Sequence, residues 1–235
     1  MMTAVFRSLA LASAVAVTAG AAAATTVSLT YNGSSAGADS RNVTITNAPV
    51  EYPGSGDWPR TVGAYGFNMT DTSGSLGSFL AWCLDLGHFL ATSGTHTYTV
   101  TTTPFSNSYG LDAGQMSRVQ AVFDANFASL NATNGNQAAG FQLALWNALY
   151  DADWQIAGGS FAATASASIM TLANGYLNAA SLYAGDREWN ITFLESSTGL
   201  QNLATVAAVP LPAAGLLLLA ALGGLGAASR RRRTA

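Results

Sequence analysis

The chain has 235 residues, of which 49% are hydrophobic and only 9% charged, a composition that suits one medium-sized domain with a substantial core. Its formal net charge is −3, it contains no lysine, and four of its nine arginines stand together near the C-terminus. The rest of the chain is too poor in basic residues to form a nucleic-acid surface, so we expect no nucleic-acid partner.

The N-terminal segment predicts a signal peptide. Arg7 precedes the apolar run SLALASAVAVTAG, and Ala22 and Ala24 supply the small residues of a signal-peptidase site. We place cleavage after Ala24, so residues 1–24 are the signal peptide and the mature chain begins at Thr25. The sequence therefore predicts an exported protein.

Short strands are predicted in the first half of the mature chain. The candidate segments are rich in β-branched and aromatic residues and are separated by clusters of Gly, Ser, Asn and Pro. They cover residues 26–31, 43–46, 62–69, 78–85 and 96–102. Five such strands favour an antiparallel β-sandwich or a barrel-like sheet.

Three helices and one further strand are predicted after these strands. Asp112 and Gln115 form a capping-box pattern, and Val119 and Phe123 begin a helical apolar period. The helices cover about 113–130, the segment NQAAGFQLALWNALYD and residues 161–183, and the last strand covers 188–195. We therefore predict an α+β domain over residues 25–204, with a helical layer of about three helices inserted before the last strand.

One glutamine interrupts the apolar face of the second predicted helix. Gln142 lies on the same side of that helix as Ala138, Leu145, Trp146 and Leu149. A buried carboxamide costs about 1–3 kcal/mol if its donors and acceptor are unpaired, so Gln142 needs a partner. A hydrogen bond to the backbone or to buried water is the common solution for an arbitrary buried glutamine.

Cys83, in the segment FLAWCLDLGHFL, is the single cysteine of the chain. It cannot form an internal disulfide, so its thiol is free, paired between chains or used in another covalent bond. It could also be a small buried hydrophobic residue. Strand alternation places Cys83 and Asp85 on one face and Trp82 and Leu84 on the other. Both faces are largely apolar, so we expect Cys83 to be interior.

An interior cysteine and an interior glutamine can react with each other. A thiolate can attack the carboxamide, expel ammonia and leave a thioester, provided that the two side chains are in contact and water is excluded. The segment FQLAL at 141–145 matches the hydrophobic-Gln-x-x-hydrophobic motif of bacterial thioester domains of surface adhesins. AWCLD resembles their cysteine motif in part, because Trp82 precedes the cysteine and Leu84 stands where an aromatic residue is usual.

The two motifs together are also similar to the WCVDL and FQLAIWE pattern of exported PEP-CTERM-type proteins. This resemblance spans roughly residues 62–195. It implies that Cys83 is the thiol donor and Gln142 the acyl donor of an internal thioester. The residues that carry the motifs around them are Trp82, Asp85, Phe141, Leu145 and Trp146.

The C-terminal segment, residues 205–235, predicts a sorting signal. A motif of five residues is followed by an apolar run at 213–228 and then by a basic cluster. The motif is Val209, Pro210, Leu211, Pro212 and Ala213, and the cluster is Arg230, Arg231, Arg232 and Arg233. The run is somewhat shorter than the roughly 20 residues that span a bilayer core. From composition alone it is a single hydrophobic helix that anchors the chain in the membrane, with the arginines cytoplasmic.

The order of these three parts resembles the VPLPA-type variant of PEP-CTERM sorting signals. That resemblance implies a Gram-negative bacterium, an exosortase-like sorting protease as partner, and a cell-surface or extracellular-matrix destination. It also implies at least transient anchoring in the inner membrane through the C-terminal helix.

We therefore expect one-shot covalent attachment to an amine- or hydroxyl-bearing surface or matrix target, and not an enzyme. The alternative is a structural extracellular-matrix or biofilm component in which Cys83 and Gln142 are merely packed. No cofactor or metal is expected, because His88 and His96 have no further ligands at suitable spacing. Asp151 and Asp153 could contribute to calcium binding, but such a pair more often caps a loop.

Overall fold

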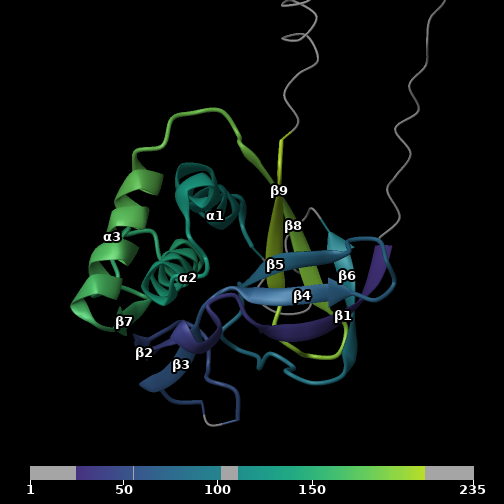
Figure 1. Ribbon diagram of the computed structural model, residues 1–235. Coiled ribbons are helices and arrows are strands. Elements are labelled where there is room, and N and C mark those ends of the chain that lie inside the picture. Colours follow the sequence, from purple (N-terminus) through teal and green to yellow (C-terminus); the bar gives the residue numbers. More distant parts are fainter. Residues whose placement is uncertain (1–24, 55, 102–110, 210–235) are drawn as a thin grey trace, which may run out of the picture.

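The structure, a computed structural model, describes residues 25–54, 56–101 and 111–209 (Figure 1). Six antiparallel strands form a closed barrel in the order β1-β4-β5-β9-β8-β6. Their bounds are β1 Thr25–Ser34, β4 Phe67–Asp71, β5 Ser78–Cys83, β9 Leu203–Ala208, β8 Trp189–Ser196 and β6 Thr95–Thr101. A second sheet has the order β3-β2-β7, with β3 at Arg60–Ala64, β2 at Arg41–Asn47 and β7 at Ala162–Thr164.

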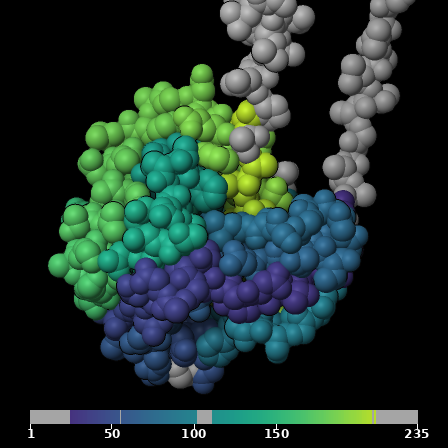
Figure 2. Space-filling model, viewed as in Figure 1, coloured from purple at the N-terminus to yellow at the C-terminus, as the bar shows by residue number. Residues whose placement is uncertain are grey.

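Three α-helices lie beside the barrel. They are α1 (Ala113–Asn126), α2 (Gly135–Tyr150) and α3 (Ala167–Ser181), and two short 3-10 helices cover Gly37–Asp39 and Phe127–Ser129. In Figure 1 the helices gather on one side, the barrel occupies the other, and the small sheet lies below α2 and α3. Figure 2 shows the helical region in continuous contact with the strands on the face in view.

Local sequence accounts for the start of both central helices. The predicted capping box of α1 is present: Gln115 N–H donates to Asp112 Oδ1 (2.7 Å), and Asp112 N–H donates to Gln115 Oε1 (2.8 Å). The side chain of Asn134 accepts from the N–H of Gln137 (3.0 Å) and caps α2. These caps satisfy backbone donors that the first turn of a helix leaves free.

Helix α2 is the centre of the core. Every residue from 138 to 150 is buried, so the helix is covered on all sides and not on one face only as its period predicted. It packs against α1 and α3 and against strands β2 and β3. A side chain on α2 therefore meets another element in any direction, and this arrangement brings Gln142 to the barrel.

The α+β class, the barrel-like sheet and the three helices agree with the prediction, with three differences. Residues 62–69 do not form one strand: β3 ends at Ala64 and β4 begins at Phe67, in different sheets. The segment 161–183 begins with the short strand β7 before α3. Strand β9 was not predicted, and it pairs with both β5 and β8. The helical layer therefore precedes the last two strands, and β9 continues past residue 204.

Several predicted features lie outside the described residues. They are the signal peptide with Ala22 and Ala24, the sorting residues Pro210, Leu211, Pro212 and Ala213, the apolar helix, and the four arginines 230–233. Of the sorting motif, Val209 is described, and its N–H donates to Glu188 O (2.8 Å). Among the helices that the structure describes, none is long and apolar enough to cross a membrane.

Candidate functional site

Cys83 is the last residue of β5, in the wall of the barrel that faces α2. Its register partner on β9 is Leu203, and Ala81 pairs with Phe67, the first residue of β4. Strand β4 therefore no longer covers β5 at Cys83, which leaves that edge of the backbone without a strand partner. The residue is 1% exposed, in agreement with the prediction that it is interior.

Gln142 occupies this vacant edge. Its side-chain Oε1 accepts from the backbone N–H of Cys83 (3.1 Å), and its Nε2 donates to the backbone carbonyl of Cys83 (2.8 Å). The carboxamide thus forms the pair of hydrogen bonds that a neighbouring strand would form. Gln142 is 0% exposed, and both ends of its carboxamide are satisfied. The structure brings the two residues together across 59 positions of sequence.

The sulfur of Cys83 is held as a thiol. Burial raises the pKa of Cys83 far above its ordinary range, and this outweighs smaller opposing effects from the Asp85 carbonyl and the Trp146 side chain. The S–H group donates to the Asp85 carbonyl oxygen (3.1 Å). A deprotonated sulfur at this position is therefore strongly disfavoured, and the resting residue is neutral.

Asp85 organises the turn that follows β5. Its Oδ1 accepts from the N–H of Gly87 (2.8 Å), and its Oδ2 pairs with Nδ1 of His88 (2.7 Å). Its backbone carbonyl, which accepts from the Cys83 thiol, also accepts from Nε2 of Gln201 (2.8 Å). The Asp85 carbonyl oxygen, which accepts the thiol proton, is therefore held in place by Gln201 and by the turn that the Asp85 side chain stabilises.

The motif residues on the other side of the pair are packed in an aromatic cluster. The rings of Trp82 and Phe141 meet edge to face with centroids 4.8 Å apart, and Phe141 also contacts Phe123 at 5.4 Å. Trp82, Phe141 and Leu145 are each 0% exposed. This cluster excludes water from the side of Gln142 that faces α1 and α3, which a thioester requires.

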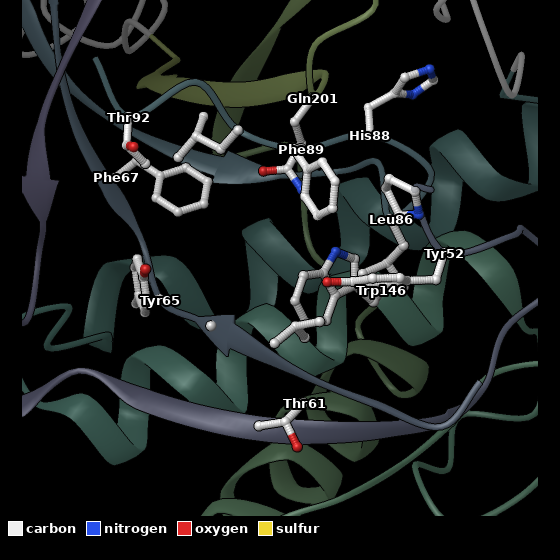
Figure 3. A pocket seen from close by; sticks show the side chains of 14 residues that line it. Tyr52, Thr61, Tyr65, Phe67, Leu86, His88, Phe89, Thr92, Trp146 and Gln201 are labelled. Carbon is white, nitrogen blue, oxygen red and sulfur yellow. The ribbon is translucent and has the colours of Figure 1, made fainter. Parts of the chain in front are cut away.

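A pocket of about 270 Å³ lies beside Trp146, which is on the same helix as Gln142 (Figure 3). Trp146, one helical turn after Gln142 on α2, contributes its indole to the lining, together with Leu86, Phe89 and Gln201. Phe89 is 56% exposed at this site, whereas Trp146 is 1% exposed. Neither Cys83 nor Gln142 lines the pocket, whereas Trp146, one helical turn from Gln142, does.

The other candidate residues have structural partners. The Asp151 carboxylate accepts from the N–H groups of Ala152, Asp153, Ser160 and Phe161, which is a loop cap. His88 pairs with Asp85 as described above, and Nε2 of His96 contacts the Ser93 carbonyl oxygen (2.9 Å). Within the described ranges no three His, Cys, Asp or Glu side chains are grouped as a metal site.

Two parts of the site were not identified from sequence. The sequence could not say which N–H group faces the Gln142 carbonyl oxygen, and the structure shows that it is that of Cys83 itself. The second part is the turn that holds the thiol, where Gln201 reaches Asp85 from 116 residues away. No local pattern signals either contact, because the first depends on where β4 begins and the second on where the β8–β9 loop lies.

No protein-family model matches the chain, and no curated protein sequence matches it. Among solved structures it is similar to the N-terminal thioester domain of a surface protein from Clostridium perfringens, with 13% identity over 72% of this chain and 100% of that one and a TM-score of 0.43. It is also similar to the N-terminal domain of the Streptococcus pyogenes pilus tip adhesin Cpa, with 14% identity over 73% of this chain and 95% of that one and a TM-score of 0.41. A third similar structure is the N-terminal thioester domain of fibronectin-binding protein SfbI from Streptococcus pyogenes, with 14% identity over 73% of this chain and 95% of that one and a TM-score of 0.40.

Proposed function

We propose that Cys83 and Gln142 form an internal thioester that attaches this protein covalently to a target, once per molecule. The observation that carries the proposal is their direct contact: the single cysteine and the buried glutamine share two hydrogen bonds in a core that excludes water. The resemblance of the FQLAL and AWCLD segments to thioester-domain motifs supports the same pairing.

The geometry suits formation of the bond. The Cys83 sulfur attacks Cδ of Gln142, and negative charge develops on Oε1, which already accepts from the Cys83 N–H (3.1 Å). Collapse of this intermediate breaks the C–N bond. The amide nitrogen leaves as ammonia with the proton that the thiol gives up, so the products are a thioester and one ammonia. The two hydrogen bonds fix the carboxamide against residue 83, and burial of both residues keeps water away.

The bond then serves as a stored acyl group. An amine or hydroxyl of the target attacks Cδ of Gln142, the C–S bond breaks, and an amide or ester to the target remains. The sulfur takes the proton that the nucleophile releases. Because burial raises the pKa of Cys83, its thiolate is a poor leaving group, and the unreacted thioester is protected from slow loss. Such a protein is consumed by its reaction and is not an enzyme.

The cellular setting that we propose rests on the terminal sequence patterns. Residues 1–24 direct export, and the segment that begins at Val209 is sorted by an exosortase-like protease with transient insertion of its apolar run in the inner membrane. The destination is then the surface or matrix of a Gram-negative bacterium, and the target is an amine- or hydroxyl-bearing polymer or cell surface. Detection of intact Arg230, Arg231, Arg232 and Arg233 on the surface-exposed protein would contradict tail removal and indicate a permanent anchor.

A structural role is the second candidate, and one observation favours it. Both the oxygen and the nitrogen of the Gln142 carboxamide are hydrogen-bonded to the backbone of Cys83, which stabilises the pair without any covalent bond. A matrix or biofilm component with this core would keep both side chains unmodified.

The intact mass of the purified exported protein separates the two candidates. We expect the mass to be lower than the sequence requires by one ammonia, and Cys83 to resist alkylation until methylamine is added. The Cys83→Ala variant should show no such deficit, because it lacks the nucleophile. A full mass together with a readily alkylated Cys83 in the native protein would refute the thioester and leave the structural role.

A further inference from the structure

The indole N–H of Trp146 is buried and has no hydrogen-bond acceptor among the described residues. Trp146 is 1% exposed, so water does not readily supply the missing acceptor. Leaving such a donor unpaired costs free energy, on the order of 1–3 kcal/mol. The Trp146 side chain nevertheless lowers the pKa of the Cys83 thiol, so the sulfur is near enough to act on. A thiol sulfur is a weak acceptor, and a sulfur that gains negative charge during the reaction would be a stronger one for this donor.

The place of Trp146 identifies that acceptor. Trp146 follows Gln142 by four residues on α2, so the two side chains lie on the same side of the helix, and the Gln142 carboxamide is bonded to Cys83. Figure 3 shows the Trp146 indole at the pocket with Leu86 and Gln201, and Gln201 donates to the carbonyl that accepts the Cys83 thiol. The indole N–H also interacts favourably with the ionised form of the Cys83 sulfur.

The two other buried indole N–H groups without a partner are placed differently. That of Trp82 belongs to the aromatic cluster with Phe141, and Trp189 packs against Phe127 with centroids 4.9 Å apart. Neither residue lines the pocket. Among these three tryptophans, only Trp146 both lines the pocket and acts on the pKa of Cys83.

We infer that Trp146 is a catalytic residue of thioester opening, in which its indole N–H donates to the Cys83 sulfur as the C–S bond breaks. The inference rests on the proposed function. The nucleophile attacks Cδ of Gln142, Oε1 carries the negative charge toward the Cys83 N–H, and the C–S electron pair then passes to the sulfur. Trp146 stabilises that developing thiolate until the sulfur takes the proton released by the nucleophile, which leaves a thiol and an amide or ester.

The test compares Trp146→Phe with Trp189→Phe in the purified exported protein. Phenylalanine keeps an aromatic side chain in each place and removes one buried unpaired N–H. Methylamine is the nucleophile, and opening is followed by the mass of the adduct and by alkylation of the released Cys83. We expect Trp146→Phe to form the thioester, with the usual ammonia deficit, and to open about 10- to 100-fold more slowly, because hydrogen bonds to charged groups contribute roughly that factor. Trp189→Phe should open at the wild-type rate.

The outcomes separate this inference from the proposed function. Opening of Trp146→Phe at the wild-type rate or faster overturns the role of Trp146 and leaves the thioester intact. Absence of the ammonia deficit in the wild-type protein refutes the thioester itself and the inference with it. If Trp146→Phe fails to fold, nitrogen-15 NMR spectra of the wild-type protein test the role of Trp146 instead. On opening by methylamine, the indole resonance of Trp146 should move and those of Trp82 and Trp189 should not, whereas an unmoved Trp146 resonance contradicts the inference.

Discussion

Gln142 and Cys83 meet through four atoms, and each hydrogen bond joins a side-chain atom to a backbone atom. The carboxamide of Gln142 replaces the strand that β5 lacks beyond Ala81, so it serves the fold and the proposed chemistry at once. A buried backbone N–H and carbonyl left without a partner would each cost about 1–3 kcal/mol. The glutamine therefore stabilises the barrel edge even before any covalent bond forms.

Two variants distinguish this stabilisation from the covalent bond. Both Gln142→Ala and Cys83→Ala prevent the thioester, but only Gln142→Ala leaves the N–H and carbonyl of residue 83 unpaired. We expect the free energy of unfolding of Gln142→Ala to be lower than that of Cys83→Ala by about 2 kcal/mol or more. Urea unfolding followed by circular dichroism measures the difference. Equal stabilities would show that Gln142 contributes nothing to the barrel edge.

Both residues of the pair could be selected from sequence because each departs from its surroundings. Cys83 is the single cysteine in an apolar strand, and Gln142 is a polar residue on an apolar helical face. Their atomic partners could not be predicted. Which backbone groups of β5 are free depends on where β4 begins, and the distant contact of Gln201 with Asp85 depends on the closure of the barrel.

At the scale of elements, the close approach of α2 and α3 holds Gln142 in place. The approach depends on Gly140, where a Cβ atom would lie 2.9 Å from Cβ of Leu172 and 3.1 Å from the backbone nitrogen of Ala173. The nitrogen of Ala173 belongs to the backbone of α3, so it cannot move away by a change of side-chain rotamer. A larger residue at position 140 therefore has to move one helix.

A matched pair of helical glycines tests this contact. Gly140→Ala should lower the free energy of unfolding, because overpacking costs roughly 1–3 kcal/mol and exceeds the gain in helix propensity. Gly175→Ala, on the exposed face of α3 with no atom within 4 Å of the added Cβ, should raise it by about 0.5–1 kcal/mol. Urea unfolding of both variants gives the comparison. A stabilising Gly140→Ala would mean that α2 and α3 are more loosely packed than described.

The elements with clear patterns were predicted, and those that depend on tertiary structure were not. Helices α1 and α2 have caps and long apolar periods, so their positions follow from the sequence. Strand β9, of sequence LATVAA, is short and rich in alanine, so its sequence gives a weak strand signal. It forms a strand because it pairs with β5 and β8 on its two edges. The break between β3 and β4 occurs at Gly66, where an added Cβ would lie 2.8 Å from Leu80 Cδ1. The buried positions shift from Ala64 to Phe67 and Met69 across that break, but the segment contains no Pro, Asp or Ser that would signal it, so the sequence predicts one strand.

At the scale of the whole molecule, the proposed bond would join the barrel to the helical layer, because Cys83 ends β5 and Gln142 lies in α2. The closed loop between them is about 60 residues long. A cross-link of that size stabilises a fold by about 4 kcal/mol on the chain-entropy estimate.

Methylamine treatment of the wild-type protein should therefore reduce its free energy of unfolding by about 4 kcal/mol, because the cross-link is lost and the contacts of the core remain. Cys83→Ala, which has no bond to open, is the control and should be unaffected by the amine. Urea unfolding before and after treatment measures the effect. A wild-type stability that does not change on opening would contradict a cross-link between the two layers.

The register of β5 also has a mechanical meaning. Cys83 pairs with Leu203 at the start of β9, the strand that ends one residue before the last described residue, and β8 pairs with β9 along its other edge. A target bonded to Gln142 and an anchor located after residue 209 would pull on the molecule from α2 and from β9. The tension would pass into β9 through hydrogen bonds on both of its edges, which carry the load together. The barrel would thus resist extraction of the strand that connects the proposed attachment site to such an anchor.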